Sequence, residues 1–126
     1  MIVLTGLDLT SVTDVNDVAS NPDTRDQIWT AREQCAHEGY PDRRAGQWAA
    51  KEAIMKALGQ GVGQLAAIDI EIINDEGRPP RAVLHGSALT RSRDLGVACL
   101  SISITHEHGA AAAIAVGLVL ERSDDD

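Results

Sequence analysis

The stretch Trp48-Ala-Ala-Lys51-Glu52-Ala-Ile-Met-Lys56-Ala-Leu58-Gly59 predicts the helix around which the rest of the chain is organised. Alanine, leucine, methionine, lysine and glutamate are strong helix formers, and Gly59 and Gly61 are expected to supply the left-handed stop at its end. Glu52 and Lys56 lie one turn apart, on the side of the helix that also carries Trp48. A side that faces a core would not normally include both charges, so this side is either a functional site or an ordinary exposed ion pair.

The composition indicates one domain with a thin core. The chain has 126 residues, of which 44% are hydrophobic, but it contains no phenylalanine, two tryptophans and one tyrosine. Its core must therefore consist of isoleucine, valine, leucine and alanine, which are small side chains. A thin core favours additional burial by oligomerisation.

The charge balance argues against a nucleic-acid surface, because the net charge is −8 and the isoelectric point is about 4.8. An anionic ligand would require cations gathered locally or a metal ion. Cys35 and Cys99 lack metal-binding spacing and are interpreted as reduced thiols of a cytoplasmic protein. The sequence shows neither a signal peptide nor an apolar run long enough to cross a membrane, so no membrane partner is expected.

The pattern of apolar residues predicts an α+β fold in which an antiparallel sheet packs on the long central helix. The small residues Ala49, Ala50, Ala53 and Ala57 would let that helix approach another backbone closely. Residues 1–120 are expected to form the domain, followed by a solvated acidic tail at 121–126. The predicted strands are 1–10, 67–73, 81–85, 97–105 and 110–120. The predicted helices are a weak one within 11–27 that is broken at 21–23, 28–37 with Thr30 and Glu33 at capping-box spacing, and 87–95.

Three polar positions outside the helix leave alternatives open. Asp8 interrupts an apolar strand, where it either points to solvent or serves a metal or a partner cation. Arg43 and Arg44 stand just before the predicted start of the central helix, poorly placed for its dipole, which indicates either a nearby anion or a solvated turn. His106 lies in a predicted turn, where an ordinary solvated histidine is the simpler interpretation.

Four stretches together resemble the holo-acyl-carrier-protein synthase type of 4′-phosphopantetheinyl transferase. They are Gly6-Leu7-Asp8-Leu9, the central helix, the strand Ile68–Ile73 followed by Asn74-Asp-Glu-Gly77-Arg78-Pro79, and Ser103-Ile-Thr105-His106. The resemblance extends from about Ile2 to Leu120, and the tryptophan–lysine–glutamate–lysine helix is its most specific part. It implies transfer of the 4′-phosphopantetheine arm of coenzyme A to a serine of an apo acyl carrier protein of fatty-acid or polyketide synthesis, with release of 3′,5′-ADP.

The resemblance also implies roles for individual residues. Asp8 and Glu52 would hold Mg²⁺, a set of two carboxylates that suits this ion when substrate oxygens and waters complete its shell. Glu52, or a water that it or Asp8 orients, would accept the serine proton. Lys56 would contact a phosphate and act with Asp8 and Glu52 in catalysis. The remaining candidates for binding coenzyme A are Arg44 at the 3′-phosphate, Gly59, Gly61 and Gly63 beside the diphosphate, and Arg78, Pro79, Thr105 and His106. Members of this family are commonly homotrimers with their sites at subunit interfaces, so the same assembly is expected here.

The sequence departs from the family in its first helical segment, which usually carries arginines that grip an acidic carrier protein. Here Arg25 is the only basic residue of that segment, and Arg32, Arg43 or Arg91 are the alternative docking cations. Two competing functions follow from the residues. A non-catalytic coenzyme A or carrier-binding module would not need both metal carboxylates. An acyltransferase that uses coenzyme A would typically place its glycine-rich loop before the helix, whereas these glycines follow it.

Overall fold

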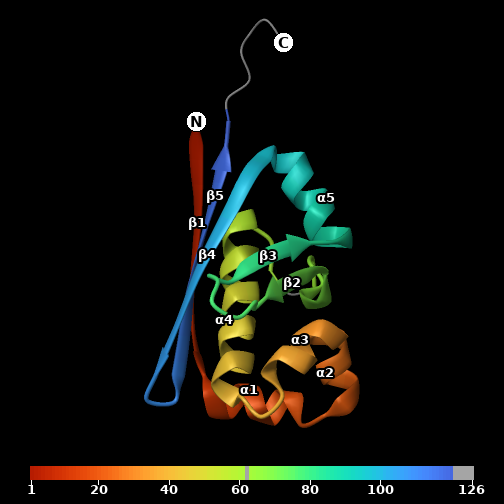
Figure 1. Ribbon diagram of the computed structural model, residues 1–126. Helices are drawn as coiled ribbons and strands as arrows, with labels where there is room; N and C mark the ends of the chain where they lie inside the picture. The colour runs from red at the N-terminus through yellow and green to blue at the C-terminus, as the bar shows by residue number, and fades with distance from the viewer. Residues whose placement is uncertain (62, 121–126) are drawn as a thin grey trace, which may run out of the picture.

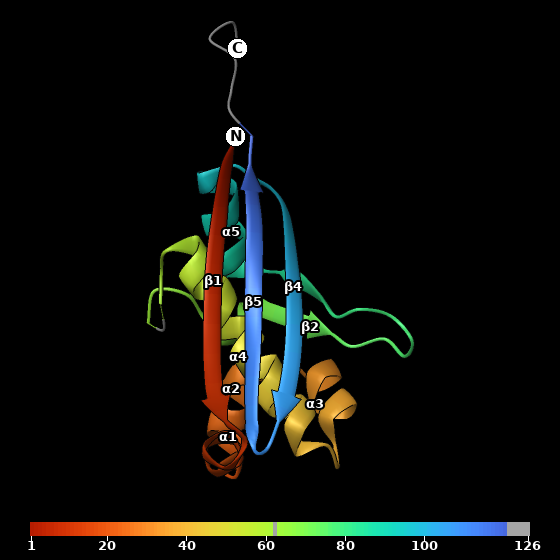
Figure 2. The same ribbon diagram turned by 90° about the vertical axis from the view of Figure 1, so that its left-hand side faces the viewer.

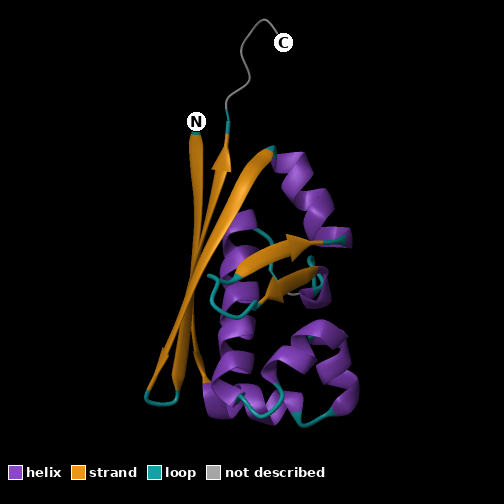
Figure 3. Cartoon of the chain, in the orientation of Figure 1, coloured by secondary structure: helices purple, strands orange, loops and turns teal. Residues whose placement is uncertain are grey.

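The central helix α4 (Pro41–Leu58) lies between a three-stranded antiparallel sheet and a second layer of short elements (Figures 1 and 3). The sheet has the order β1-β5-β4, formed by β1 (Ile2–Ser11), β5 (Ala110–Val119) and β4 (Val97–Glu107). This computed structural model describes residues 1–61 and 63–120. The acidic tail expected at 121–126 lies outside the described residues. The predicted α+β architecture is confirmed.

The second layer covers the side of α4 that faces away from the sheet. It contains an antiparallel pair of strands and four helices besides α4, together with a short 3-10 helix, η1. Its elements are α1 (Val12–Ala19), α2 (Pro22–Ile28), α3 (Ala31–His37), η1 (Ala67–Asp69), β2 (Ile70–Ile73), β3 (Arg81–Leu84) and α5 (Gly86–Leu95).

Several element boundaries differ from the sequence prediction. Helix α4 begins at Pro41, seven residues before the stretch that predicts it, because a proline is well tolerated in the first turn of a helix. The predicted break at 21–23 instead starts α2, because the Asn21 side chain accepts hydrogen bonds from the backbone N–H groups of Asp23 and Thr24. The strand predicted at 67–73 begins at Ile70, and β4 continues to Glu107.

The end of α4 uses only one of the two predicted glycines. Gly59 is left-handed, with φ of 72°, and its backbone N–H donates to the Lys56 carbonyl. Gly61 does not have a positive φ, so the prediction that it shares this role is wrong. Gly63 is left-handed, with φ of 95°, and bends the loop that follows.

Strand β1 and helix α4 touch backbone to backbone. A Cβ atom placed on Gly6 would lie 1.8 Å from the carbonyl oxygen of Ala53, so only glycine fits there. Small residues also line the middle strand, where Ala111, Ala113 and Ala115 are buried beneath α4. The predicted close approach of this helix to another backbone is confirmed.

The opposite face of the sheet, which is turned toward the viewer in Figure 2, exposes mostly apolar side chains along β1 and β5. Residues that alternate with the buried ones point outward, and adjacent outward residues pair across the strands, as Leu7 does with Ile114. Leu7 is 65% exposed and Leu9 is 72% exposed. The other exposed apolar side chains on these strands include Val3 and Val116.

A buried ion pair fastens the second layer to α4. The Lys51 ammonium donates hydrogen bonds to Glu33 Oε1 (2.9 Å) and to the carbonyl oxygens of Ala67 (2.9 Å) and Ile70 (2.5 Å). The Glu33 carboxylate also accepts from the backbone N–H groups of Thr30 and Ile72, and the predicted Thr30–Glu33 capping box is confirmed. Both side chains are completely buried. Desolvation lowers the pKa of Lys51, against the attraction of Glu33.

Candidate active site

Asp8, Glu52 and Lys56 lie together where β1 crosses α4. The Lys56 ammonium is 3.2 Å from Asp8 Oδ1 and donates a 2.8 Å hydrogen bond to the carbonyl oxygen of Leu7. Asp8 alternates with Gly6 on the face of β1 that packs against α4, so its side chain points inward and not into solvent. The close contact at Gly6 is what brings a strand carboxylate within reach of a helix lysine.

The two carboxylates repel each other. Burial raises the pKa of Glu52 first, the negative charge of Asp8 raises it further, and Lys56 partly opposes both effects. A half-buried carboxylate that is destabilised by a second carboxylate is an arrangement that a divalent cation relieves.

The donor set fits magnesium. The described residues contain no cluster of three or more histidine, cysteine, aspartate or glutamate side chains that could enclose a metal ion. Magnesium is commonly bound by one or two carboxylates plus substrate phosphates and waters, so Asp8 and Glu52 would suffice when a diphosphate is present.

The glycine loop leaves the C-terminal end of α4 on the β1 side of the sheet, as Figure 2 shows. The described glycines of this loop, Gly59, Gly61 and Gly63, are exposed. Gly63 also lines a groove of about 790 Å³ between α2 and the residues that follow the loop, together with Gln27, Trp48, Leu65 and Ser87. The predicted diphosphate-binding glycines are therefore open to a ligand.

Arg78, Pro79, Thr105 and His106, which are also predicted binding residues, lie at the opposite edge of the sheet. His106 is on β4, in register with Ala111 of β5, which pairs in turn with Thr10 of β1. Its Nδ1 is 3.6 Å from Asp42 Oδ2, in the first turn of α4. Two strand spacings, about 9 to 10 Å, therefore separate the backbone of β4 from that of β1.

Thr105 and the hairpin residues also belong to this second edge. Thr105 is exposed, in a register that places it on the outer face of the sheet. Arg78 and Pro79 are exposed in the loop between β2 and β3, which projects past β4 in Figure 2. One chain thus carries the predicted residues as two groups on opposite edges of its sheet.

Arg44 belongs to neither group. It projects toward the short helices, where its Nη1 donates a 3.0 Å hydrogen bond to Asn16 Oδ1. Of the proposed docking cations, Arg32 pairs with Asp75, Arg43 donates to the Ala36 carbonyl, and Arg91 donates to the Leu58 carbonyl. Each of these three arginines already has a partner within its own chain.

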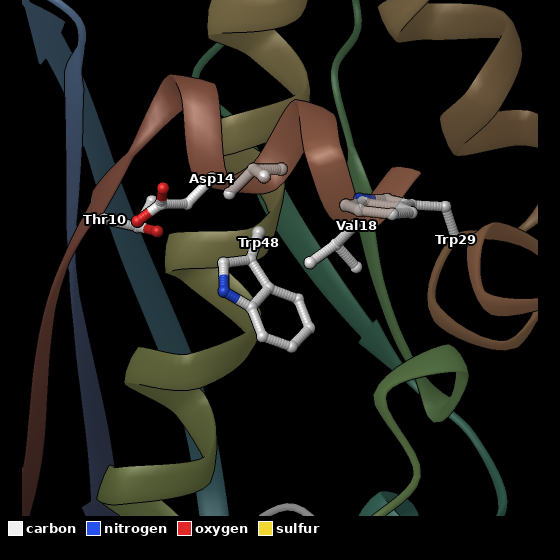
Figure 4. Close-up of a pocket in the computed structure, with 6 residues that line it drawn as sticks. Thr10, Asp14, Val18, Trp29 and Trp48 are labelled. Atoms are coloured by element: carbon white, nitrogen blue, oxygen red, sulfur yellow. The ribbon is translucent and has the colours of Figure 1, made fainter. Parts of the chain in front are cut away.

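Trp48 lines two cavities that the sequence did not predict. It lines the large groove and also a small apolar cavity of about 80 Å³, where Figure 4 shows its indole near Thr10, Asp14 and Val18. The sequence did place Trp48 on the same side of the central helix as Glu52. It did not predict how the short helices would close a cavity around the indole.

Comparison with known proteins gives one consistent result. A model of the 4′-phosphopantetheinyl transferase superfamily matches residues 5–114. The holo-[acyl-carrier-protein] synthase of Herpetosiphon aurantiacus is 34% identical over 126 residues, which cover 93% of this chain and 99% of that protein. The corresponding protein of Moorella thermoacetica is 47% identical over 72 residues, and the match covers 57% of this chain and 56% of that protein.

A larger protein also contains a similar segment. Fatty acid synthase subunit alpha of Schizosaccharomyces pombe is 40% identical over 90 residues, which cover 69% of this chain but 5% of that protein. Among solved structures, the holo-[acyl-carrier-protein] synthase of Helicobacter pylori in complex with coenzyme A superposes with a TM-score of 0.80 at 25% identity. That match covers 91% of this chain and 100% of the other. No described helix is long and apolar enough to cross a membrane.

Proposed function

Because this chain belongs to the 4′-phosphopantetheinyl transferase superfamily, we propose that it moves the 4′-phosphopantetheine arm of coenzyme A to a serine of an apo acyl carrier protein. The observation that carries this proposal is the cluster of Asp8, Glu52 and Lys56, which joins two repelling carboxylates to a lysine beside an open glycine loop. Binding alone would not need both carboxylates.

In the reaction, the serine oxygen of the carrier forms a bond to the phosphorus that bears the pantetheine arm. The bond from that phosphorus to the bridging oxygen breaks, and 3′,5′-ADP leaves. Glu52, or a water that it or Asp8 orients, accepts the serine proton, a role that the raised pKa of Glu52 suits. Lys56 stabilises negative charge on the diphosphate, and the exposed glycine amides assist it. Mg²⁺, when bound by Asp8 and Glu52, would supply charge neutralisation at the diphosphate.

Intact mass spectrometry of the carrier protein tests the proposed transfer. The protein is incubated with coenzyme A, Mg²⁺ and a panel of apo carrier proteins, which are then weighed intact. A carrier that gains one phosphopantetheine arm, with the gain abolished by a chelator, supports the transferase and its metal. Coenzyme A binding without transfer to any carrier would favour the non-catalytic binding module. Asp8→Asn and Glu52→Gln should each reduce turnover by at least about a hundredfold, and near-normal turnover would contradict the metal assignment.

We further propose that each complete site forms between two copies of this chain in a homotrimer. The separation of the two residue groups supports this, because one copy presents Asp8, Glu52 and Lys56 on the β1 side while His106 lies at the β4 edge. The exposed apolar face of β1 and β5 provides a surface that association would bury. Arg78, Pro79, Thr105 and His106 would then bind coenzyme A against the neighbour's glycine loop, and Arg44 is a candidate for its 3′-phosphate.

Mixed assemblies test this arrangement. Lys56→Met and His106→Ala damage opposite edges, so each variant alone should be inactive. In a co-expressed one-to-one mixture, about one quarter of the sites would combine two undamaged edges, so about a quarter of native activity should return. A mixture that remains inactive although native mass spectrometry shows mixed trimers would place the site within one chain. A fully active monomer would also exclude the interface.

A further inference from the structure

Two arginines from different helices share a cavity away from the carboxylates. Arg25 of α2 and Arg44 of α4 line a space of about 320 Å³ together with Gln34, His37 and Glu38. Arg44 precedes Glu52 by eight helical residues, which places it about 12 Å farther toward the start of α4. The phosphoryl transfer proposed above makes no use of Arg25.

Both guanidinium groups have buried donors without acceptors. The Nε atoms of Arg25 and Arg44 are buried, and neither has a hydrogen-bond partner. Among the residues that the structure describes, the only side chain that accepts a hydrogen bond from Arg44 is Asn16, a neutral amide. Neither arginine forms an ion pair with any residue in 1–61 or 63–120. Leaving such N–H groups unpaired is unfavourable, and most buried donors in proteins find a partner.

The neighbouring acids do not neutralise the pair. Glu33 is held by Lys51, and Asp26 accepts from the Gln34 amide. Glu38 lines the cavity but lies beyond ion-pair distance of both guanidinium groups. The two arginines also act on each other, because desolvation lowers the pKa of Arg44 and the positive charge of Arg25 lowers it further. In a chain with a net charge of −8, two neighbouring cations that form no ion pair with a carboxylate favour the binding of an anion.

We propose that Arg25 and Arg44 together bind an oxyanion in this cavity, namely the phosphate or carboxylate group of a small molecule. Either oxyanion offers several acceptor lone pairs, so it can accept from both buried Nε–H groups and offset the repulsion between the guanidinium groups. The site goes beyond the proposed transfer reaction. Its oxyanion has two possible sources, the 3′-phosphate of coenzyme A or a separate small molecule.

Calorimetric titration with inorganic phosphate and with citrate tests the site without any measurement of activity. Arg25→Gln and Arg44→Gln should each weaken binding of at least one of these anions by about tenfold or more, because each removes one of two charge-assisted contacts. Arg32→Gln is the matched control, since Arg32 lies outside the cavity and pairs with Asp75. Arg25→Lys keeps the charge and should retain part of the affinity. Circular dichroism and melting curves confirm that each variant is folded.

Coenzyme A and its analogue without the 3′-phosphate distinguish the two sources. If Arg25→Gln weakens binding of coenzyme A but not of the analogue, the oxyanion is the 3′-phosphate. If it weakens binding of phosphate or citrate and leaves coenzyme A unchanged, the site takes a separate ligand. The proposal is overturned if a folded Arg25→Gln protein binds phosphate, citrate and coenzyme A within about twofold of the native protein, or if the native protein binds none of them. Either result can occur whether or not the chain transfers phosphopantetheine.

Discussion

Replacing Lys51 by methionine should unfold much of the population at moderate temperature, whereas the same change at Lys56 should leave the protein folded. The two lysines stand five positions apart on α4, but Lys51 is fully buried and Lys56 is 54% exposed. Lys51→Met would leave the Glu33 carboxylate buried without its counter-charge and would remove the donor from two backbone carbonyls. Breaking a buried ion pair by removing one partner costs about 3 to 5 kcal/mol.

The expected change in melting temperature follows from the size of the domain. For a chain of this length, 1 kcal/mol corresponds to about 4 °C, so Lys51→Met should lower the melting temperature by about 12 to 20 °C. Lys56→Met removes one half-exposed ion pair, which contributes at most about 1 kcal/mol, and should lower it by less than about 4 °C. Lys56→Met should instead abolish transfer. Thermal and urea unfolding, followed by circular dichroism and tryptophan fluorescence, provide the comparison.

A second variant tests whether the loss of stability in Lys51→Met arises from the buried Glu33 carboxylate that is left without a counter-charge. Glu33→Gln in the Lys51→Met background removes that charge, so the double variant should be more stable than the sum of the two single losses predicts. The reasoning is refuted if Lys51→Met melts within about 4 °C of the native protein. It is also refuted if the two single losses add without coupling, because groups in direct contact should not behave independently.

Three further changes follow from the site and the sheet. Because the pKa of Glu52 is raised on folding, the folded state favours the protonated carboxyl group. The contribution of Glu52 to the stability of the fold is therefore fully present below the ordinary pKa of 4.5, and it is lost as the pH rises through the raised pKa. Glu52→Gln should therefore melt higher than the metal-free native protein at pH 7 and show no such gain at pH 4; an equal gain at both pH values would contradict the assigned cause. Gly6→Ala should cost at least about 1 to 3 kcal/mol in urea unfolding, because its Cβ would overlap the Ala53 carbonyl oxygen, and a neutral result would mean that β1 can move away. Leu7→Glu on the exposed sheet face should leave a folded chain that light scattering finds as a monomer, and an unchanged oligomer would place the interface elsewhere.

Local signals in the sequence predicted local structure well. The capping box at Thr30 and Glu33 was predictable because both partners lie within one helical turn. Alternation of apolar and acidic residues predicted the strand within 67–73, and Asp8 was unusual because it interrupts an apolar strand. These features depend on neighbours in the chain, which a sequence displays directly.

Features that depend on distant partners were not predictable. The sequence did not predict that Lys51 is buried, because the carboxylate that pairs with Lys51 in the core belongs to α3. The start of α4 at Pro41 was missed because residues 41–47 lack a clear apolar period. The sequence did not predict that Arg25 of α2 and Arg44 of α4 line one cavity, because no periodicity encodes their proximity.

The alanines beneath α4 make the geometry of the active site depend on the packing of the core. Ala113 lies beside Asp8 in the sheet, and its methyl group helps to set the distance at which the helix rests above the strands. A larger side chain there would have to be absorbed by moving the helix, since protein interiors have little free volume. Such a movement would carry Glu52 away from Asp8. The small size of the alanines between the sheet and α4 therefore sets the distance between the two carboxylates. A substitution at such a core position, which touches no substrate, can change the rate of the reaction.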